Sequence, residues 1–275
     1  MPGAHLPHFC TDRRDHVVPP QEHLDMVEGL LAQQAASRVS DADAATYHAH
    51  AAEYWDAFYS RHENRCCTAR RGRSREFPEL VAASEADAPP TTILEVGCGA
   101  GNTVFPLLSV NKNPGLRLIA CDYAPQAVQV VKSHDLYRNP PAGSCEAYVW
   151  DLSQGAGRKS CGWKDTQAEH GAPVSDIASS ASYTASFDTS RLPPNVQPGT
   201  VDIVVLIFVL SALHPREWKA AADNVYQMLK PRSGLVLLRD YGRHDLPQLR
   251  FKKNRMLDDN FYGVSYVSQT NPSAR

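Results

Sequence analysis

Several features are missing from this sequence of 275 residues. No apolar run approaches the roughly 18 residues that suggest a membrane-spanning helix; the longest, Ile203 to Leu210, is short and rich in β-branched residues. No apolar block accompanies Arg13 and Arg14, so we expect no secretory signal, and the early acids Asp12 and Asp15 argue against a transit peptide. The formal net charge is −2, so any attraction to nucleic acid requires a local basic patch.

The seven cysteines also lack the spacing of metal ligands. None forms a C-x-x-C pair, so the spacing typical of a zinc site is absent, and we expect no metal. Their number is odd, and Cys98 and Cys121 stand in apolar, strand-like contexts. Free thiols of this kind favour a reducing compartment, and we expect a cytoplasmic location.

Apolar residues recur with helical spacing from Glu22 to Ala36 and again from Asp41 to Tyr59. Beyond residue 90, short apolar runs alternate with amphipathic segments. We expect strands at 93–96, 116–121, 147–150, 201–210 and 234–238, and helices at 102–110, 125–133 and 215–229. This alternation predicts an α/β fold with a mostly parallel sheet covered on both faces. Residues 153–199 interrupt it and are expected to form an inserted surface loop.

A glycine-rich turn follows the first strand, in the sequence EVGCGAG at 95–101. Dinucleotide sites prefer G-x-G-x-x-G, whereas G-x-G-x-G after an acid is typical of proteins that bind S-adenosylmethionine (SAM). Asp122, at the end of the second strand, can accept hydrogen bonds from ribose hydroxyls with either cofactor. Asp151 and Leu152, after the third strand, suit an adenine and favour SAM. NAD stays the alternative, but we find no catalytic Tyr-Lys or His motif to accompany it.

Longer segments resemble a narrower family. AAEYWDAFYSRHENR at 51–65, EFPEL at 76–80, ILEVGCGAGNTVFPLL at 93–108, LIFVLSALHP at 206–215 and the run at 237–257 are similar to transfer-RNA (tRNA) 3-methylcytidine methyltransferases of the methyltransferase-like family. The resemblance covers roughly residues 45–262 apart from the insert. It implies a Rossmann-like class I SAM methyltransferase sheet with an N-terminal helical extension. It also implies methyl transfer to N3 of a cytidine in the tRNA anticodon loop, commonly at position 32.

The resemblance assigns roles to individual residues. The implied cofactor-binding residues are Trp55, Tyr59, Gly97, Asp122, Asp151, Leu152 and Ile207. Trp55 and Tyr59 would close over SAM, although their spacing alone favours simple packing of their helix. Ile207 would line the floor of the pocket. Asp240 is the candidate catalytic residue that would orient the target base; the alternative is that it caps the turn that follows it.

Two basic clusters could contact the tRNA backbone. One is the arginine-rich run at 61–75, for which a solvated face is the alternative interpretation. The other consists of Arg243, Arg250, Lys252, Lys253 and Arg255. The resemblance also allows an aminoacyl-tRNA synthetase or another tRNA-recognition protein as a partner, because recognition in this family often depends on partner proteins.

The sequence predicts four regions: an arm and helix at 1–44, a helical lid and basic linker at 45–90, the methyltransferase domain at 91–262, and a divergent tail at 263–275. The linker carries CCTARRGRSR where the family usually has aromatic residues. The family's last strands are expected to be missing, which would expose a sheet edge. The alternative function is therefore a non-catalytic SAM- or RNA-binding subunit, or a truncated isoform, that supports another methyltransferase.

Overall fold

The computed structural model describes residues 20–62, 76–155 and 191–263. Most of the arginine-rich run and most of the insert therefore lie outside the described residues. The chain divides into a smaller unit, residues 1–45 with 242–265, and a larger unit that contains residues 46–241. The sequence places residues 242–262 with the methyltransferase domain, whereas in the structure they group with the N-terminal segment.

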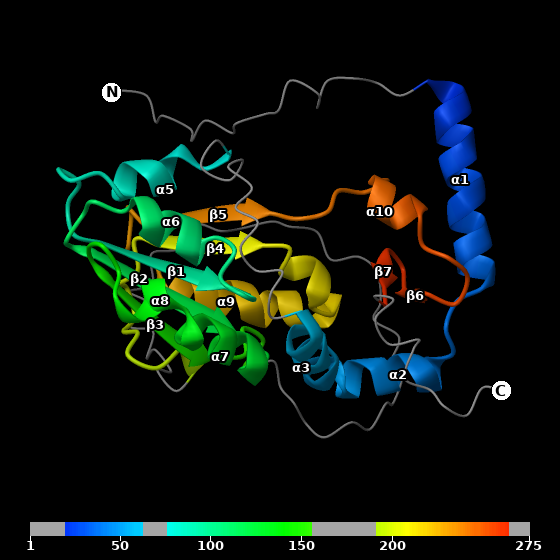
Figure 1. The fold of residues 1–275 in the computed structure, drawn as a ribbon. Coiled ribbons are helices and arrows are strands. Elements are labelled where there is room, and N and C mark those ends of the chain that lie inside the picture. The colour runs from blue at the N-terminus through cyan, green and yellow to red at the C-terminus, as the bar shows by residue number, and fades with distance from the viewer. Residues whose placement is uncertain (1–19, 63–75, 156–190, 264–275) are drawn as a thin grey trace, which may run out of the picture. The chain divides into compact units, whose positions relative to one another are not determined.

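The larger unit is built on a parallel sheet (Figure 1). Its described strands lie in the order β3-β2-β1-β4-β5. They are β1 (Thr91–Val96), β2 (Leu116–Asp122), β3 (Ser144–Val149), β4 (Ile203–Ile207) and β5 (Leu235–Arg239). The chain leaves central β1 toward β2 on one side and returns through β4 on the other, which makes the end of β1 a switch point where ligands commonly bind. The predicted α/β class is confirmed.

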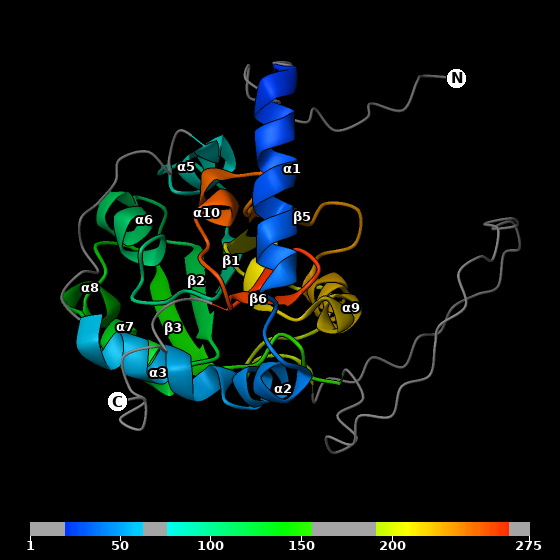
Figure 2. The same ribbon diagram turned by 90° about the vertical axis from the view of Figure 1, so that its right-hand side faces the viewer.

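Alternate strand residues enter two hydrophobic clusters, because successive side chains of a strand point to opposite faces. Ile93 and Leu118 face α5 (Pro78–Ala83), α6 (Val104–Val110) and α7 (Pro125–Ser133). Leu94 and Ile119 face α9 (Trp218–Met228) and the segment after residue 191. Figure 2 shows α6 and the short α8 (Asp135–Arg138) on one side of the sheet and α9 on the other. The predicted cover on both faces is therefore present.

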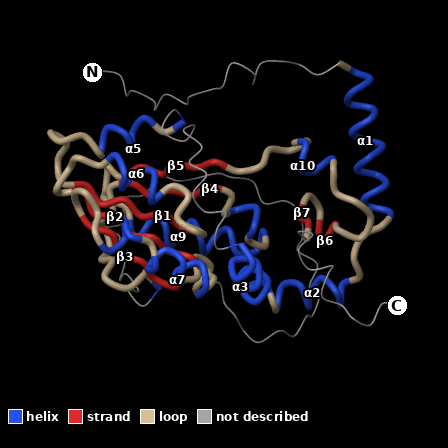
Figure 3. The backbone as a smooth tube through the Cα atoms, viewed as in Figure 1, coloured by secondary structure: helices blue, strands red, loops and turns tan. Residues whose placement is uncertain are grey.

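Some element boundaries differ from the sequence prediction (Figure 3). The helix expected from Asp41 to Tyr59 is two helices, α2 (Asp41–Ala49) and α3 (Ala51–His62), separated at His50. The strand expected at 201–210 ends at Ile207, because Phe208 adopts a left-handed conformation with φ of 57° and turns the chain out of the sheet. The EFPEL segment at 76–80 leads into helix α5.

Two further observations concern the periphery of the larger unit. Leu192 and Val196 are buried beside α9, so the last part of the predicted surface loop belongs to the core. Strand β5 is the edge strand, and its Leu235, Val236 and Leu238 are 46%, 45% and 50% exposed. Among the described residues, β5 thus forms an exposed apolar edge, and the expected absence of the family's last strands stays a prediction. In the described residues, no helix combines the length and the apolar character needed to cross a membrane.

The smaller unit is held together by a buried polar network. It contains α1 (Gln21–Ala36), the start of α2, α10 (Leu246–Leu249), β6 (Met256–Asp258) and β7 (Phe261–Tyr262). The side-chain amide of Gln34 donates to the carbonyls of Gln248 and Phe251 at 3.0 and 3.2 Å. The hydroxyl of Tyr262 donates to the Gln34 side-chain oxygen at 2.9 Å. One glutamine therefore joins α1 to residues more than 200 positions away.

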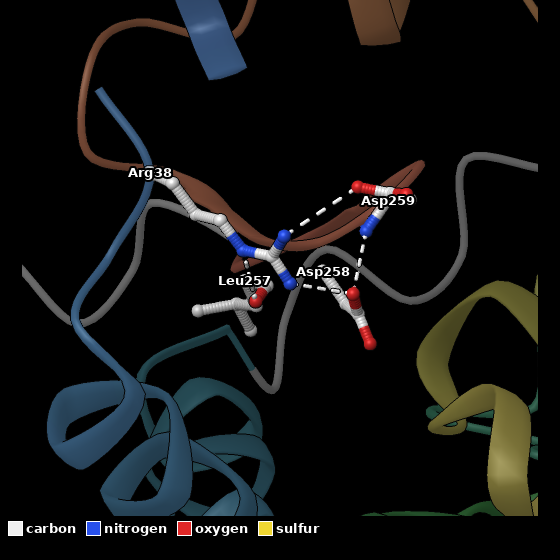
Figure 4. Close-up of polar contacts among 4 residues, drawn as sticks. All are labelled: Arg38, Leu257, Asp258 and Asp259. Atoms are coloured by element: carbon white, nitrogen blue, oxygen red, sulfur yellow. Dashed lines mark hydrogen bonds and ion pairs between the residues drawn. The ribbon is translucent and has the colours of Figure 1, made fainter. Parts of the chain in front are cut away.

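Arg38 adds a surface connection within the same unit (Figure 4). Its Nε donates to the carbonyl of Leu257 at 3.2 Å, and its terminal nitrogens face the carboxylates of Asp258 and Asp259. Because the pairs are exposed, we expect them to contribute little free energy. They do fix where the chain leaves α1.

We predict that Gln34→Leu lowers the free energy of unfolding of the smaller unit by about 1–3 kcal/mol, because buried hydrogen-bonding groups lose their partner. The change is measured from the hydrogen-exchange rates of the backbone amides of α1, recorded at increasing urea concentrations. Gln33→Leu is the matched control, because Gln33 is the exposed neighbour of the same residue type. Equal effects of the two substitutions would contradict the assigned role of the network.

Candidate active site

A cavity opens at the carboxyl ends of the strands of the larger unit. Its walls come from the turn after β1, the end of β2, and the loops after β3 and β4, with α3 across one side. These segments are far apart in sequence. They meet because parallel strands end at the same edge of the sheet, as the pairing of Val96 with Cys121 shows.

The glycine-rich turn is tightly enclosed. Gly97 has a φ of +64°, and a Cβ atom there would lie 2.8 Å from Cγ2 of Val209. At Gly99, with a φ of +53°, a Cβ atom would lie 2.6 Å from the hydroxyl oxygen of Tyr59. Both positions require glycine, for conformation and for space. The turn thus lies between the loop after β4 and the aromatic helix α3.

Asp122 connects this turn to the next helix. Its Oδ2 accepts the N–H of Gly99 at 2.7 Å, and its Oδ1 accepts the N–H of Ala124 at 2.9 Å. Burial raises the pKa of the Asp122 carboxyl, and hydrogen bonds from backbone amides oppose that rise. An ionised carboxylate offers about four acceptor positions, so Asp122 keeps capacity for ligand hydroxyls.

Asp151 and Leu152 line the cavity after β3. The Asp151 carboxylate accepts hydrogen bonds from the backbone and side chain of Ser153 at 2.9 and 2.7 Å. The carbonyl of Leu152 accepts a bond from Asn224 at 2.8 Å, and the same amide group reaches the carbonyl of Gln154 at 3.0 Å. Asn224 is fully buried on α9, so helix α9 fixes the shape of this loop.

Helix α3 contributes an aromatic wall. Trp55 and Tyr59 line the cavity, with ring centroids 6.1 Å apart and ring planes within 25° of parallel. Phe58 packs edge-on against both rings and lies outside the cavity lining in the described structure. The structure therefore brings Trp55, Tyr59, Gly97, Asp122, Asp151 and Leu152 to one cavity. Their roles in holding a cofactor stay predictions.

Two predicted residues lie elsewhere. Ile207 packs into the cluster beneath α6 and α7, because it shares a strand face with Ile203 and Val205. Phe208 and Val209 line the cavity in its place. The Asp240 carboxylate accepts the N–H groups of Ser211 and Tyr241 at 3.0 and 2.8 Å, outside the cavity lining of the described residues. In this structure it fastens the loop after β4, and its catalytic role stays a prediction.

The structure also adds residues that sequence reasoning missed. His48, Trp150, Phe208, Val209 and Glu217 line the cavity. Phe208 and Val209 stand in the recognised LIFVLSALHP segment, so they could have been proposed beside Ile207. His48 and Glu217 carry no local sequence signal, because only the folded chain brings the end of α2 near the 3-10 turn η4 (Pro215–Glu217).

Comparison with known proteins extends this description. Residues 68–271 match a family model described as a methyltransferase domain. The tRNA N(3)-methylcytidine methyltransferase trm140 of Schizosaccharomyces pombe is 40% identical over 254 residues, which are 92% of this chain and 69% of that protein. The tRNA(Thr) (cytosine(32)-N(3))-methyltransferase of Saccharomyces cerevisiae is 40% identical over 248 residues, or 90% of this chain and 34% of that protein. Human tRNA N(3)-cytidine methyltransferase METTL6 is 36% identical over 76% of this chain and 59% of its own length.

The chain belongs to the tRNA N3-methylcytidine methyltransferase family. It spans between 34% and 69% of the length of these relatives. The cofactor of this family is SAM.

The cavity fits SAM. Two carboxylates stand at neighbouring strand ends, and the rings of Trp55 and Tyr59 can face a sulfonium cation. No lysine or arginine is among the described residues that line the cavity. A dinucleotide would bring a charged pyrophosphate to this turn, whereas SAM carries no phosphate.

We predict that Asp122→Ala weakens SAM binding by roughly 10²- to 10⁴-fold, because two charge-assisted hydrogen bonds to the ribose are lost. Isothermal titration calorimetry measures the change. Asp223→Ala is the control, because Asp223 pairs with Lys219 on the exposed side of α9. Comparable SAM binding by the Asp122 variant and the wild type would show that another group holds the ribose.

The affinity for SAM should also depend on pH. An ordinary aspartate has a pKa of about 3.9. Since burial raises the pKa of Asp122, the affinity for SAM should begin to fall at a higher pH than an ordinary aspartate would give. The effect on folding has the opposite sign: the raised pKa favours the folded state at low pH, and this contribution is lost as pH rises through the folded-state value. Calorimetric titrations across acidic pH measure the first effect. A profile with the midpoint of an ordinary aspartate would contradict it.

Proposed function

We propose that this protein transfers a methyl group from SAM to N3 of a cytidine in the anticodon loop of tRNA, at position 32. The relatives support this proposal by their names, which specify tRNA and cytidine N3. The described residues contribute a cofactor cavity with an exposed aromatic surface at its rim.

That aromatic surface is the observation that carries the proposal. The rings of Phe208 and Tyr241 lie 4.6 Å apart with an interplanar angle of 30°. Phe208 lines the cavity and is 39% exposed, and Tyr241 is 54% exposed. The guanidinium of Arg239 lies 5.4 Å from the centre of the Phe208 ring. Unstacked bases of RNA bind to aromatic and guanidinium planes of this kind.

The conformation of Phe208 supports the same role. A bulky residue with a positive φ is uncommon, and such strain is concentrated at functional sites. The Phe208 N–H donates to the carbonyl of Arg239 at 2.8 Å, which holds this conformation in place. The loop therefore presents the ring at the cavity instead of continuing the strand.

SAM, when bound, would supply a methyl group on a cationic sulfur. The in-plane lone pair of cytosine N3 would form the N–C bond without prior deprotonation while the S–C bond breaks, so that S-adenosylhomocysteine leaves as a neutral thioether and the positive charge passes to the base. The protein then needs to position its ligands and exclude water. We assign the ribose to Asp122, the adenine to Asp151 and Leu152, and the exclusion of water to Trp55 and Tyr59. N3 lies on the pairing edge, so the base must be unpaired or flipped to reach the site.

In this proposal, Asp240 orients the aromatic pair of Phe208 and Tyr241. Its carboxylate holds the amides of Ser211 and Tyr241, and Tyr241 is half of the aromatic pair. Asp240 can therefore orient the platform that receives the base. Its negative charge would also favour the cationic methylated product.

In this proposal, basic residues of the smaller unit bind the phosphates of the rest of the tRNA. Arg243, Arg250, Lys252 and Lys253 are exposed, and exposed basic side chains bind phosphates. A tRNA-recognition protein, such as an aminoacyl-tRNA synthetase, would complete substrate selection. The proposed location is the cytoplasm, and the free thiols of Cys98, Cys121 and Cys145 support it.

Mass spectrometry of tRNA nucleosides after incubation with the protein and SAM tests the proposal. The expected product is 3-methylcytidine, absent when the Asp122→Ala variant replaces the wild type. A folded protein that binds SAM but transfers no methyl group, alone or with added lysate, would instead be a non-catalytic SAM- or RNA-binding subunit.

A double charge reversal, Lys252→Glu with Lys253→Glu, should weaken tRNA binding at least tenfold and flatten its salt dependence, because phosphate contacts are lost. SAM affinity should not change, since both lysines belong to the smaller unit. Filter binding at several salt concentrations and calorimetry measure the two affinities. A loss of SAM affinity would contradict the assignment of these lysines to the tRNA.

A further inference from the structure

Helix α3 covers one side of the cavity, so its attachment to the rest of the larger unit decides how well the cofactor is enclosed. Ala51, Trp55 and Tyr59 line the cavity from successive turns of this helix. Asp56 follows Trp55 and lies about 100° further around the helix axis. Its side chain is directed to α7 and not to the cavity.

Asp56 provides a helix cap from outside the capped helix. Its Oδ1 accepts the N–H of Gln126, in the first turn of α7, at 2.8 Å. The N-cap residue of α7 is Ala124, whose methyl side chain cannot accept a hydrogen bond. The carboxylate of Asp56 takes over this function, and its negative charge is favourable at a helix N-terminus.

The same turn is bound to the cofactor-facing acid. The N–H of Ala124 donates to Asp122 at 2.9 Å, and that of Gln126 donates to Asp56. Pro125 stands between them and has no N–H. Three consecutive residues thus connect the carboxylate that faces the ribose to the helix that carries Trp55. Displacing α3 breaks one of these two bonds.

Two further contacts hold this side of the cavity in place. The hydroxyl of Tyr59 lies against Gly99 of the glycine-rich turn. Near the other end of the wall, Nε2 of His48 lies 3.7 Å from Oε1 of Glu217, whose other oxygen accepts the N–H of His214 at 3.2 Å. Because His48 lies on α2, this second contact holds the helix that precedes α3. Asp56 and Tyr59 are the residues through which α3 itself contacts α7 and the glycine-rich turn.

We propose that Asp56 is a positioning residue that clamps α3 over bound SAM through the amide of Gln126 and so slows the release of the cofactor. This inference rests on the proposed role of the cavity as the SAM site. It is independent of which nucleoside accepts the methyl group.

The test measures SAM dissociation from the full chain by stopped-flow displacement. Asp56→Ala should accelerate release on the order of tenfold, the effect of removing a helix cap. Asp56→Asn should restore slow release, because asparagine caps helices as well as aspartate does. Glu53→Ala is the control, since Glu53 is an exposed acid on the same helix that pairs only locally, with His50.

The conservative variant separates this role from a general loss of stability. Release from Asp56→Ala that is as slow as from the wild type, or fast release from Asp56→Asn, would overturn the clamp. If Asp56→Ala does not fold, Asp56→Gln replaces it, because its oxygen lies one methylene further out and should fail to cap. A wild-type protein that binds no SAM would overturn the proposed function together with this inference.

Discussion

The candidate active site depends on the hydrogen bonds of one buried carboxylate. Asp122 holds the amide of Gly99 from the turn after β1 and the amide of Ala124 before α7. A buried acid without such bonds would be costly to keep charged. With them, the carboxylate fixes two cavity walls and still has room for a ligand. The clamp at Asp56 extends this arrangement to the helix that covers the cofactor.

The two units are stabilised by different means. The larger one buries apolar strand residues between helices on both faces, which positions the strand ends rigidly. The smaller one has few buried apolar side chains, among them Val27 and Met256, and depends on the polar network around Gln34. This division matches the proposed functions: a rigid sheet for the cofactor and a smaller unit that carries the exposed basic cluster of Arg243, Arg250, Lys252 and Lys253 for tRNA.

Strand β5 combines two properties. Its carboxyl end leads to Asp240 and Tyr241 at the cavity rim, and its Leu235, Val236 and Leu238 are about half exposed along the edge. Arg239 at its end pairs with Glu76, just before α5. The edge strand therefore supports the proposed base platform with only one neighbouring strand, β4, among the described residues. Packing along β5 would consequently affect the geometry of the platform.

The α/β class, the glycine turn and the two acids can be predicted from the sequence alone, because these follow from local rules: apolar runs, glycine spacing and acids at strand ends. The family motifs added Trp55 and Tyr59, which the structure brings to the same cavity. The predicted boundaries differ from the structure where the conformation of a single residue ends an element, as at His50 and Phe208.

The side chains that complete the cavity wall follow from the packing of the folded chain. Ile207 and Phe208 are adjacent in sequence, yet one enters the core and the other the cavity, because the strand ends between them. The contacts of Asp56 with Gln126 and of His48 with Glu217 join residues 70 and 169 positions apart. No local pattern specifies such pairs, since their distance is set by how the sheet and its helices pack.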